Sequence, residues 1–209
     1  MFDAIFFDLD GTLIDTESLA LVAGMQAFAE VGYPVTLDFM HRLVGRDEPS
    51  GALVIAAAFP DLDQGLLHPK WRDGFRAALA EGLQMKDGAR ELLAALRLPV
   101  ALVTSSGRAS AHYKLGLVGL ADHFHAVITL DDVTAAKPAP DPYLLAANKL
   151  GVAPARCLVF EDSEAGAEAA HRAGCRVVQV PDVVPSEGRW AHHLAPSLLE
   201  GALAAGLKL

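Results

Sequence analysis

Cysteine, basic charge and long apolar runs are all scarce in this sequence. Only two cysteines, Cys157 and Cys175, occur in 209 residues, too few for a disulfide framework, so we expect two buried free thiols. Lysine and arginine number 17 against 26 aspartate and glutamate residues, which gives a net charge of −9. Nucleic-acid-binding proteins normally carry a basic stripe, and an acidic balance also disfavours binding to anionic membrane surfaces.

Apolar stretches long enough to span a membrane are missing as well. None approaches the roughly 18 residues that a bilayer requires, and no secretory signal precedes the apolar segment at residues 4–7. We therefore expect a cytoplasmic protein with no nucleic-acid or membrane partner. The sequence leaves its oligomeric state open between monomer and homodimer.

What the chain does contain is an alternation of strand-like and helix-like segments. Short apolar runs without polar interruption are typical of strands covered on both faces, as in a parallel sheet. The expected strands are Ala4–Phe7, Pro99–Val103, Ala126–Leu130, Leu158–Phe160 and Arg176–Val180, and the helix-like stretches include Gly88–Leu98, Arg108–Leu115, Pro142–Leu150 and Pro196–Leu207. Strands alternating with helices predict a doubly wound α/β fold with a parallel sheet.

One region lacks strand patterns and predicts a separate helical domain. Apolar residues recur at helical spacing in residues 16–31, and Gly32 follows as a stop signal. Further helices are expected at residues 37–44 and 51–59, with Pro60 and Pro69 between helices. We predict a helical domain at residues 15–83, inserted into a core made of residues 1–14 and 84–209.

Two carboxylates, Asp8 and Asp10, follow the first expected strand. Residues i and i+2 of a strand point to the same side, and Gly11 allows a sharp turn directly after them. Open α/β sheets bind ligands at the carboxyl ends of their strands, which is where this pair falls. The alternative is an acidic turn that only ends the strand.

Small hydroxyl residues follow a second expected strand, and one lysine lies on a further loop. Thr104 and Ser105 come after the strand at residues 99–103, where hydroxyls and free amides at a helix N-terminus can bind an anion or cap the helix. Lys137 precedes Pro138 on a loop that prolines stiffen. Such a lysine can provide a point charge for phosphate, or it can be a solvated loop residue.

A second acidic pair, Glu161 and Asp162, follows the strand at residues 158–160. Carboxylate oxygens suit Mg²⁺, although acidic residues also stabilise helix N-termini without any metal. Taken together, the four segments that carry these residues would supply a nucleophile, an anion site, a cation and a metal site on one edge of one sheet. Phosphoryl transfer requires those parts.

The segments that carry these residues resemble the four motifs of the haloacid dehalogenase-like superfamily, in its branch of phosphoglycolate phosphatases and β-phosphoglucomutases. The first motif is highly specific, the last is specific in combination with it, and the middle two are weak alone. They are FFDLDGTL at residues 6–13, VTSS at 103–106, KPAPD at 137–141 and FEDSEAG at 160–166. The resemblance covers almost the whole chain and implies a Rossmann-like core with an inserted helical cap.

The resemblance also implies roles for individual residues. Asp8 would attack phosphorus and become an aspartyl phosphate, while Asp10 would act as general acid and then general base. Mg²⁺ would bind the Asp8 carboxylate, the Asp10 carbonyl and Asp162, with Glu161 as a possible further ligand. The phosphoryl oxygens would be held by Thr104, the Ser105 amide and Lys137.

The helical insert would then act as a lid that excludes water and contacts the substrate, a small phosphorylated metabolite. Arg46 is a candidate for such a contact, and a solvated arginine is the alternative. Ala20 stands where the mutase branch carries a histidine, which weakens the mutase hypothesis without removing it, since the role of His41 is open. We therefore predict a Mg²⁺-dependent phosphatase, with a sugar-phosphate mutase or a catalytically silent phosphate-binding module as alternatives.

Overall fold

The computed structural model describes residues 1–44 and 48–209, and these form two compact units. The first unit contains Met1–Asp15 and Gln84–Leu209, and the second contains Thr16–Leu83. None of the helices in the described ranges combines the length and apolarity that crossing a membrane requires.

The first unit is built on a parallel sheet of six strands, counted over the described residues, in the order β3-β2-β1-β4-β5-β6. Because β1 lies between β2 and β4, the chain leaves β1 on one side and later returns on the other, which makes the fold doubly wound. The strands are β1 (Ala4–Phe7), β2 (Val100–Val103), β3 (Ala126–Ile128), β4 (Cys157–Glu161), β5 (Arg176–Gln179) and β6 (His193–Leu194). This architecture confirms the predicted α/β fold.

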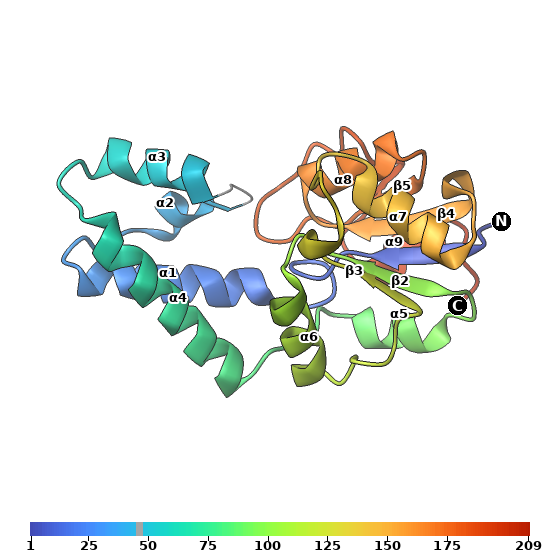
Figure 1. Cartoon of the computed structure of the whole chain (residues 1–209), viewed down its shortest axis with the longest axis horizontal. Coiled ribbons are helices and arrows are strands. Elements are labelled where there is room, and N and C mark those ends of the chain that lie inside the picture. Colours follow the sequence, from blue (N-terminus) through green and yellow to red (C-terminus); the bar gives the residue numbers. More distant parts are fainter. Residues whose placement is uncertain (45–47) are drawn as a thin grey trace. The chain divides into compact units, whose positions relative to one another are not determined.

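Helices cover both faces of this sheet (Figure 1). α7 packs against β1, β2, β3 and α8, while α5 packs against α9. The helices are α5 (Ala89–Ala95), α6 (Arg108–Leu117), α7 (Asp141–Leu150), α8 (Glu164–Arg172) and α9 (Leu198–Ala204), with the short 3-10 helices η1 (Leu130–Asp132) and η2 (Pro154–Arg156). Phe6, Val103 and Tyr143 belong to a buried core between the sheet and α7. Every residue of β1, β2 and β4 is buried, so both faces of these strands are covered, as continuous apolar runs predict.

β1 has the expected bounds, whereas β2, β3, β4 and β5 differ from the sequence expectation by one or two residues at one end or both, and a sixth strand is added. The run Ala126–Leu130 ends as a strand at Ile128, because Thr129 caps η1 and exchanges hydrogen bonds with Asp132. β6 was not predicted at all: it has two residues, His193 and Leu194, which is too short to show a pattern.

The second unit is helical among its described residues and has its own aromatic core. Its helices are α1 (Thr16–Glu30), α2 (Leu37–His41), α3 (Glu48–Ala58) and α4 (Gln64–Glu81). Phe28 contacts Phe39, Phe59 and Trp71 with ring centroids 5.7, 5.9 and 6.1 Å away. The sequence predicts Pro69 between two helices, but the structure places it inside α4. α4 packs extensively on α1, and such packing can offset the backbone hydrogen bond that a proline removes.

Candidate active site

The carboxylate of Asp8 is paired with the ammonium of Lys137 at the end of β1. The Asp8 amide donates to the carbonyl of Phe160 at 3.0 Å, so the hydrogen bonding between β1 and β4 continues up to this residue. Lys137 Nζ lies 2.6 Å from Asp8 Oδ1 and 2.8 Å from the carbonyl oxygen of Val103. Both side chains are almost wholly buried, so the pair is poorly screened by water.

Glu161, the last residue of β4, contacts the lysine of this pair. Its Oε1 accepts hydrogen bonds from Lys137 Nζ at 2.6 Å and from the Tyr143 hydroxyl at 2.7 Å, and its Oε2 accepts from Ser163 Oγ at 3.1 Å. The carboxylate packs directly on α8 at Gly166, where an added Cβ would lie 1.8 Å from Oε1. Glu161 therefore fixes the position of Lys137, and Gly166 in α8 leaves the space that the Glu161 carboxylate occupies.

Asp162 lies next to the turn that follows β1. Its Oδ1 accepts a hydrogen bond from Thr12 Oγ1 at 3.2 Å, and its backbone carbonyl accepts one from Gln179 Nε2 at 3.1 Å. Gly11 has a φ of +85°, and a Cβ there would lie 2.5 Å from Asp162 Oδ2. Glycine is thus needed at position 11 both for the left-handed turn and for the close approach of this carboxylate.

These carboxylates form a cluster that fits a hard cation. One oxygen each from Asp8, Glu161 and Asp162 lie within 4.8 Å of one another. Burial raises the pKa of Asp8 to about 8 although Lys137 opposes the shift, and burial together with Asp8 and Glu161 raises the pKa of Asp162 well above its usual value. Because clustered buried carboxylates favour a shared cation and offer only oxygen ligands, the donor set suits Mg²⁺.

Asp10 is held by Ser106, which the sequence places in the second motif without a role of its own, and by Lys114, which the sequence analysis did not predict as a site residue. Lys114 Nζ lies 2.6 Å from Asp10 Oδ1, and Ser106 Oγ donates to Asp10 Oδ2 at 2.8 Å. Lys114 also donates to Ser106 Oγ at 3.0 Å. A signal for Lys114 does exist in the sequence, because it shares an apolar helical stripe with Ala111 and Leu115, where a lysine is unexpected.

The predicted anion-binding residues lie at the end of β2. Thr104 is buried, and its Oγ1 accepts a hydrogen bond from the Ser106 amide at 3.0 Å, while Ser105 is exposed. Ser106 therefore connects Thr104 to Asp10, and Lys137 connects Asp8 to Glu161. The structure brings all of these strand-end residues to the same edge of the sheet, whereas Arg46 lies outside the described residues.

An α/β core with an acidic cluster, a buried lysine and small hydroxyls at its strand ends is the arrangement expected of a phosphoryl-transfer enzyme. A family model described as haloacid dehalogenase-like hydrolase matches residues 2–174. The chain belongs to this family, as its motifs predict.

Curated relatives and solved structures are similar to the chain over most of its length. It is 33% identical to a phosphorylated carbohydrates phosphatase of Thermotoga maritima, over 82% of each chain. It is 35% identical to a fructose-1-phosphate phosphatase of Escherichia coli, over 84% of this chain and 95% of that one. A haloacid dehalogenase-like protein of unknown function from Agrobacterium tumefaciens superposes with a TM-score of 0.85 at 28% identity, covering 98% of this chain and 97% of that one.

Proposed function

We propose that the chain is a Mg²⁺-dependent phosphatase that hydrolyses a small phosphomonoester, a sugar phosphate or a phosphoglycolate-like compound, through an aspartyl phosphate on Asp8. The observation that carries the proposal is the buried contact of Asp8 with Lys137, next to the carboxylate cluster that includes Asp162. This arrangement brings a nucleophile, a fixed cation and oxygen ligands together at one edge of the sheet, which are the parts that phosphoryl transfer requires.

In the first half-reaction, an oxygen of the Asp8 carboxylate attacks phosphorus and the bond from phosphorus to the ester oxygen breaks. Asp10 gives its proton to the departing alcohol. The phosphoryl group is now bonded to Asp8, and its remaining oxygens accept hydrogen bonds from Lys137, the Thr104 hydroxyl and the Ser105 amide.

In the second half-reaction, water attacks the same phosphorus and gives a proton to Asp10. The bond from phosphorus to Asp8 breaks, which releases inorganic phosphate and restores the free carboxylate. Asp8, Asp162, the backbone carbonyl of Asp10 and Glu161 are the residues that would hold Mg²⁺. When bound, the ion neutralises charge on the phosphoryl oxygens.

The substrate class rests on the relatives, which are named for phosphorylated carbohydrates and for fructose 1-phosphate. The second unit, Thr16–Leu83, would serve as the cap that closes over the substrate, with Arg46 as a candidate contact. The strand-end residues would bind the phosphate group, so the cap would contact the remaining part of the substrate and set its specificity.

The mutase alternative requires a group that activates a sugar hydroxyl. Ala20, in α1, stands where the mutase branch carries a histidine, and its methyl group cannot transfer a proton. Its backbone carbonyl accepts a hydrogen bond from the Trp71 indole at 2.9 Å. Water is therefore favoured over a sugar hydroxyl as the second nucleophile. NMR of a hexose 1-phosphate incubation separates the two, because isomerisation supports a mutase and free phosphate supports a phosphatase.

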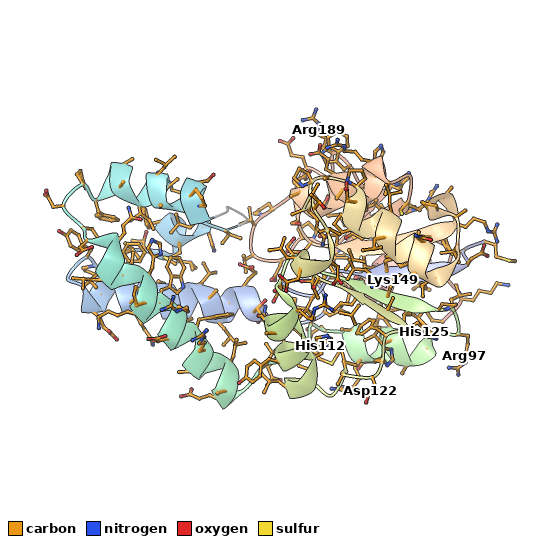
Figure 2. The ribbon with its side chains drawn as sticks, in the orientation of Figure 1. Arg97, His112, Asp122, His125, Lys149 and Arg189 are labelled. Carbon is orange, nitrogen blue, oxygen red and sulfur yellow. The ribbon has the colours of Figure 1, made fainter. Side chains whose placement is uncertain are left out.

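The decisive experiment is phosphate release from a panel of sugar phosphates, phosphoglycolate and nucleotides, with Mg²⁺ and with EDTA. We expect turnover of at least one compound with Mg²⁺ only, and loss of that turnover in Asp8→Asn and in Asp162→Asn. Asp122→Asn is the matched control, because Asp122 is an exposed aspartate of the first unit (labelled in Figure 2). A folded protein that hydrolyses no compound, or an Asp8→Asn variant with full activity, would disprove the proposal.

A further inference from the structure

Lys114 is a buried lysine directed at the proposed proton-transfer residue. Only 6% of its side chain is exposed, although it lies near the end of α6, away from the four strand-end motifs. Side chains on a helix lean toward its N-terminus, and α6 begins at Arg108, one short loop after β2 ends at Val103. Lys114 therefore reaches back to the edge of the sheet that holds Asp10.

Lys114 contacts one oxygen of the Asp10 carboxylate directly and is linked to the other through Ser106. Lys114 Nζ is 2.6 Å from Asp10 Oδ1, and Ser106, which donates to Asp10 Oδ2 at 2.8 Å, accepts from Lys114 at 3.0 Å. The three groups form a closed triangle of hydrogen bonds. Such a triangle fixes the plane of the carboxylate as well as its location, which a single contact could not do.

Stability alone gives a poor reason for a lysine at this position. Ala111 and Leu115, its neighbours on the same helical stripe, are fully buried apolar residues. Removing an ammonium from water is costly, and apolar residues of similar volume often replace buried ion pairs without loss of stability. Lys114 is a charged residue on an apolar stripe, and its ammonium contacts the Asp10 carboxylate. This combination points to a role for Lys114 in the chemistry of Asp10.

We propose that Lys114 is a positioning residue that, with Ser106, holds the Asp10 carboxylate in the orientation needed for both proton transfers. The inference rests on the proposed function, in which Asp10 first protonates the leaving oxygen and then accepts a proton from water. Both transfers depend on where the carboxylate oxygens lie, and a misplacement of about 1 Å can reduce a rate by about 100-fold.

The test compares Lys114→Met with the wild-type protein on a substrate from the panel. Methionine is unbranched and apolar, so it suits the buried stripe while removing the ammonium. We expect kcat to fall by about 10- to 100-fold with KM and the Mg²⁺ midpoint changed by less than about threefold. Lys149→Met is the matched control and should keep wild-type kcat, because Lys149 is an exposed lysine on α7 (Figure 2).

A double mutant separates positioning from a general structural effect. If Lys114 acts through Asp10, adding Lys114→Met to Asp10→Asn should lower kcat by less than about threefold beyond Asp10→Asn alone. If it acts independently of Asp10, Lys114→Met should lower kcat in the Asp10→Asn background by the same factor as in the wild type, and that result would overturn the inference. A Lys114→Met variant with wild-type kcat would overturn it too.

Ser106→Ala provides a second route if Lys114→Met does not fold. It removes the other donor of the triangle and should lower kcat by about 3- to 30-fold in the wild-type background, with less than about threefold further loss in Asp10→Asn. A full further loss counts against the inference. Wild-type protein that is folded but inactive on the whole panel rejects the proposed function, and this inference with it; an active wild type with an equally active Lys114→Met rejects the inference alone.

Discussion

Lys137 and Glu161 form an ion pair at 2.6 Å in which the glutamate side chain has no solvent exposure and the lysine side chain only 5%. The three N–H groups of Lys137 meet Glu161, Asp8 and the Val103 carbonyl. Burial alone would lower the pKa of Lys137, but Asp8 and Glu161 raise it above its usual value. The lysine is therefore a permanent cation, and a phosphoryl oxygen can bind it only by taking the place of one of these acceptors.

Replacing Lys137 with methionine should damage both stability and activity. Glu161 would be left as a buried carboxylate without its cation, a change that typically costs about 3–5 kcal/mol. Urea unfolding measures this loss, and we expect kcat/KM to fall by at least about 100-fold because the phosphoryl oxygens lose their charged donor. The double variant Lys137→Met/Glu161→Gln should lose less stability than the sum of the two single variants; additive losses would show that the pair is not coupled.

Tyr143→Phe should weaken the fold while sparing the reaction. The hydroxyl donates to Glu161 Oε1 at 2.7 Å, but Lys137 and Ser163 still hold that carboxylate when it is removed. We expect a loss of about 1–2 kcal/mol in the free energy of unfolding, with kcat within about threefold of wild type. Tyr113→Phe is the control, since Tyr113 is half exposed on α6 and should change stability by less than about 0.5 kcal/mol. A large loss of kcat in Tyr143→Phe would assign the hydroxyl a direct part in the chemistry.

Gly166→Ala tests whether Glu161 needs the space beside α8. An added Cβ would lie 1.8 Å from Glu161 Oε1, so the buried carboxylate and Lys137 must move. We expect a destabilisation of at least about 2 kcal/mol and a loss of kcat/KM of at least about 10-fold. Gly116→Ala in α6 meets no atom within 4 Å among the described residues and should be neutral or stabilising by up to about 1 kcal/mol. Equal behaviour of the two variants in thermal unfolding and kinetics would contradict this account.

Asp132 should make stability depend on acid pH. Partial burial would raise its pKa, but hydrogen bonds from Thr129 and the charge of Arg108 lower it from 3.8 to about 2. Because the folded-state pKa is depressed, the stabilisation is fully present above the unfolded value near 4 and disappears as the pH falls toward 2. Asp132→Asn should therefore lower the free energy of unfolding by about 1 kcal/mol at neutral pH. The difference from wild type should shrink in denaturant titrations between pH 5 and pH 3, and a constant difference would refute the assignment.

The sequence predicts the strand-end residues well for a geometric reason. Asp8, Thr104 and Asp162 each follow a short apolar run, and parallel strands end at one edge of their sheet, so the fold alone places them together. Lys114 escapes the same reasoning because a lysine in a helix is ordinarily solvated, and only its place on the stripe with Leu115 marks it as buried.

The misassigned elements have local causes. Pro69 is a helix breaker by intrinsic propensity, yet it lies within α4, where packing on α1 outweighs that propensity. β6 contains only His193 and Leu194 and is defined by its hydrogen bonds to β5, not by a sequence pattern. Both are cases in which tertiary contacts, which the sequence pattern does not encode directly, decide the secondary structure.

The two chain segments that lead into and out of the second unit are paired with each other. The Asp15 amide donates to the Gln84 carbonyl at 2.9 Å, and Ile14 bridges Met85 in antiparallel fashion. The 68 residues of Thr16–Leu83 thus begin and end at adjacent points, as an insertion into a complete domain does. In topological terms the segment is a closed excursion: because its two ends are held together within the first unit, its length can change without moving the strand ends that carry Asp8 and Asp162.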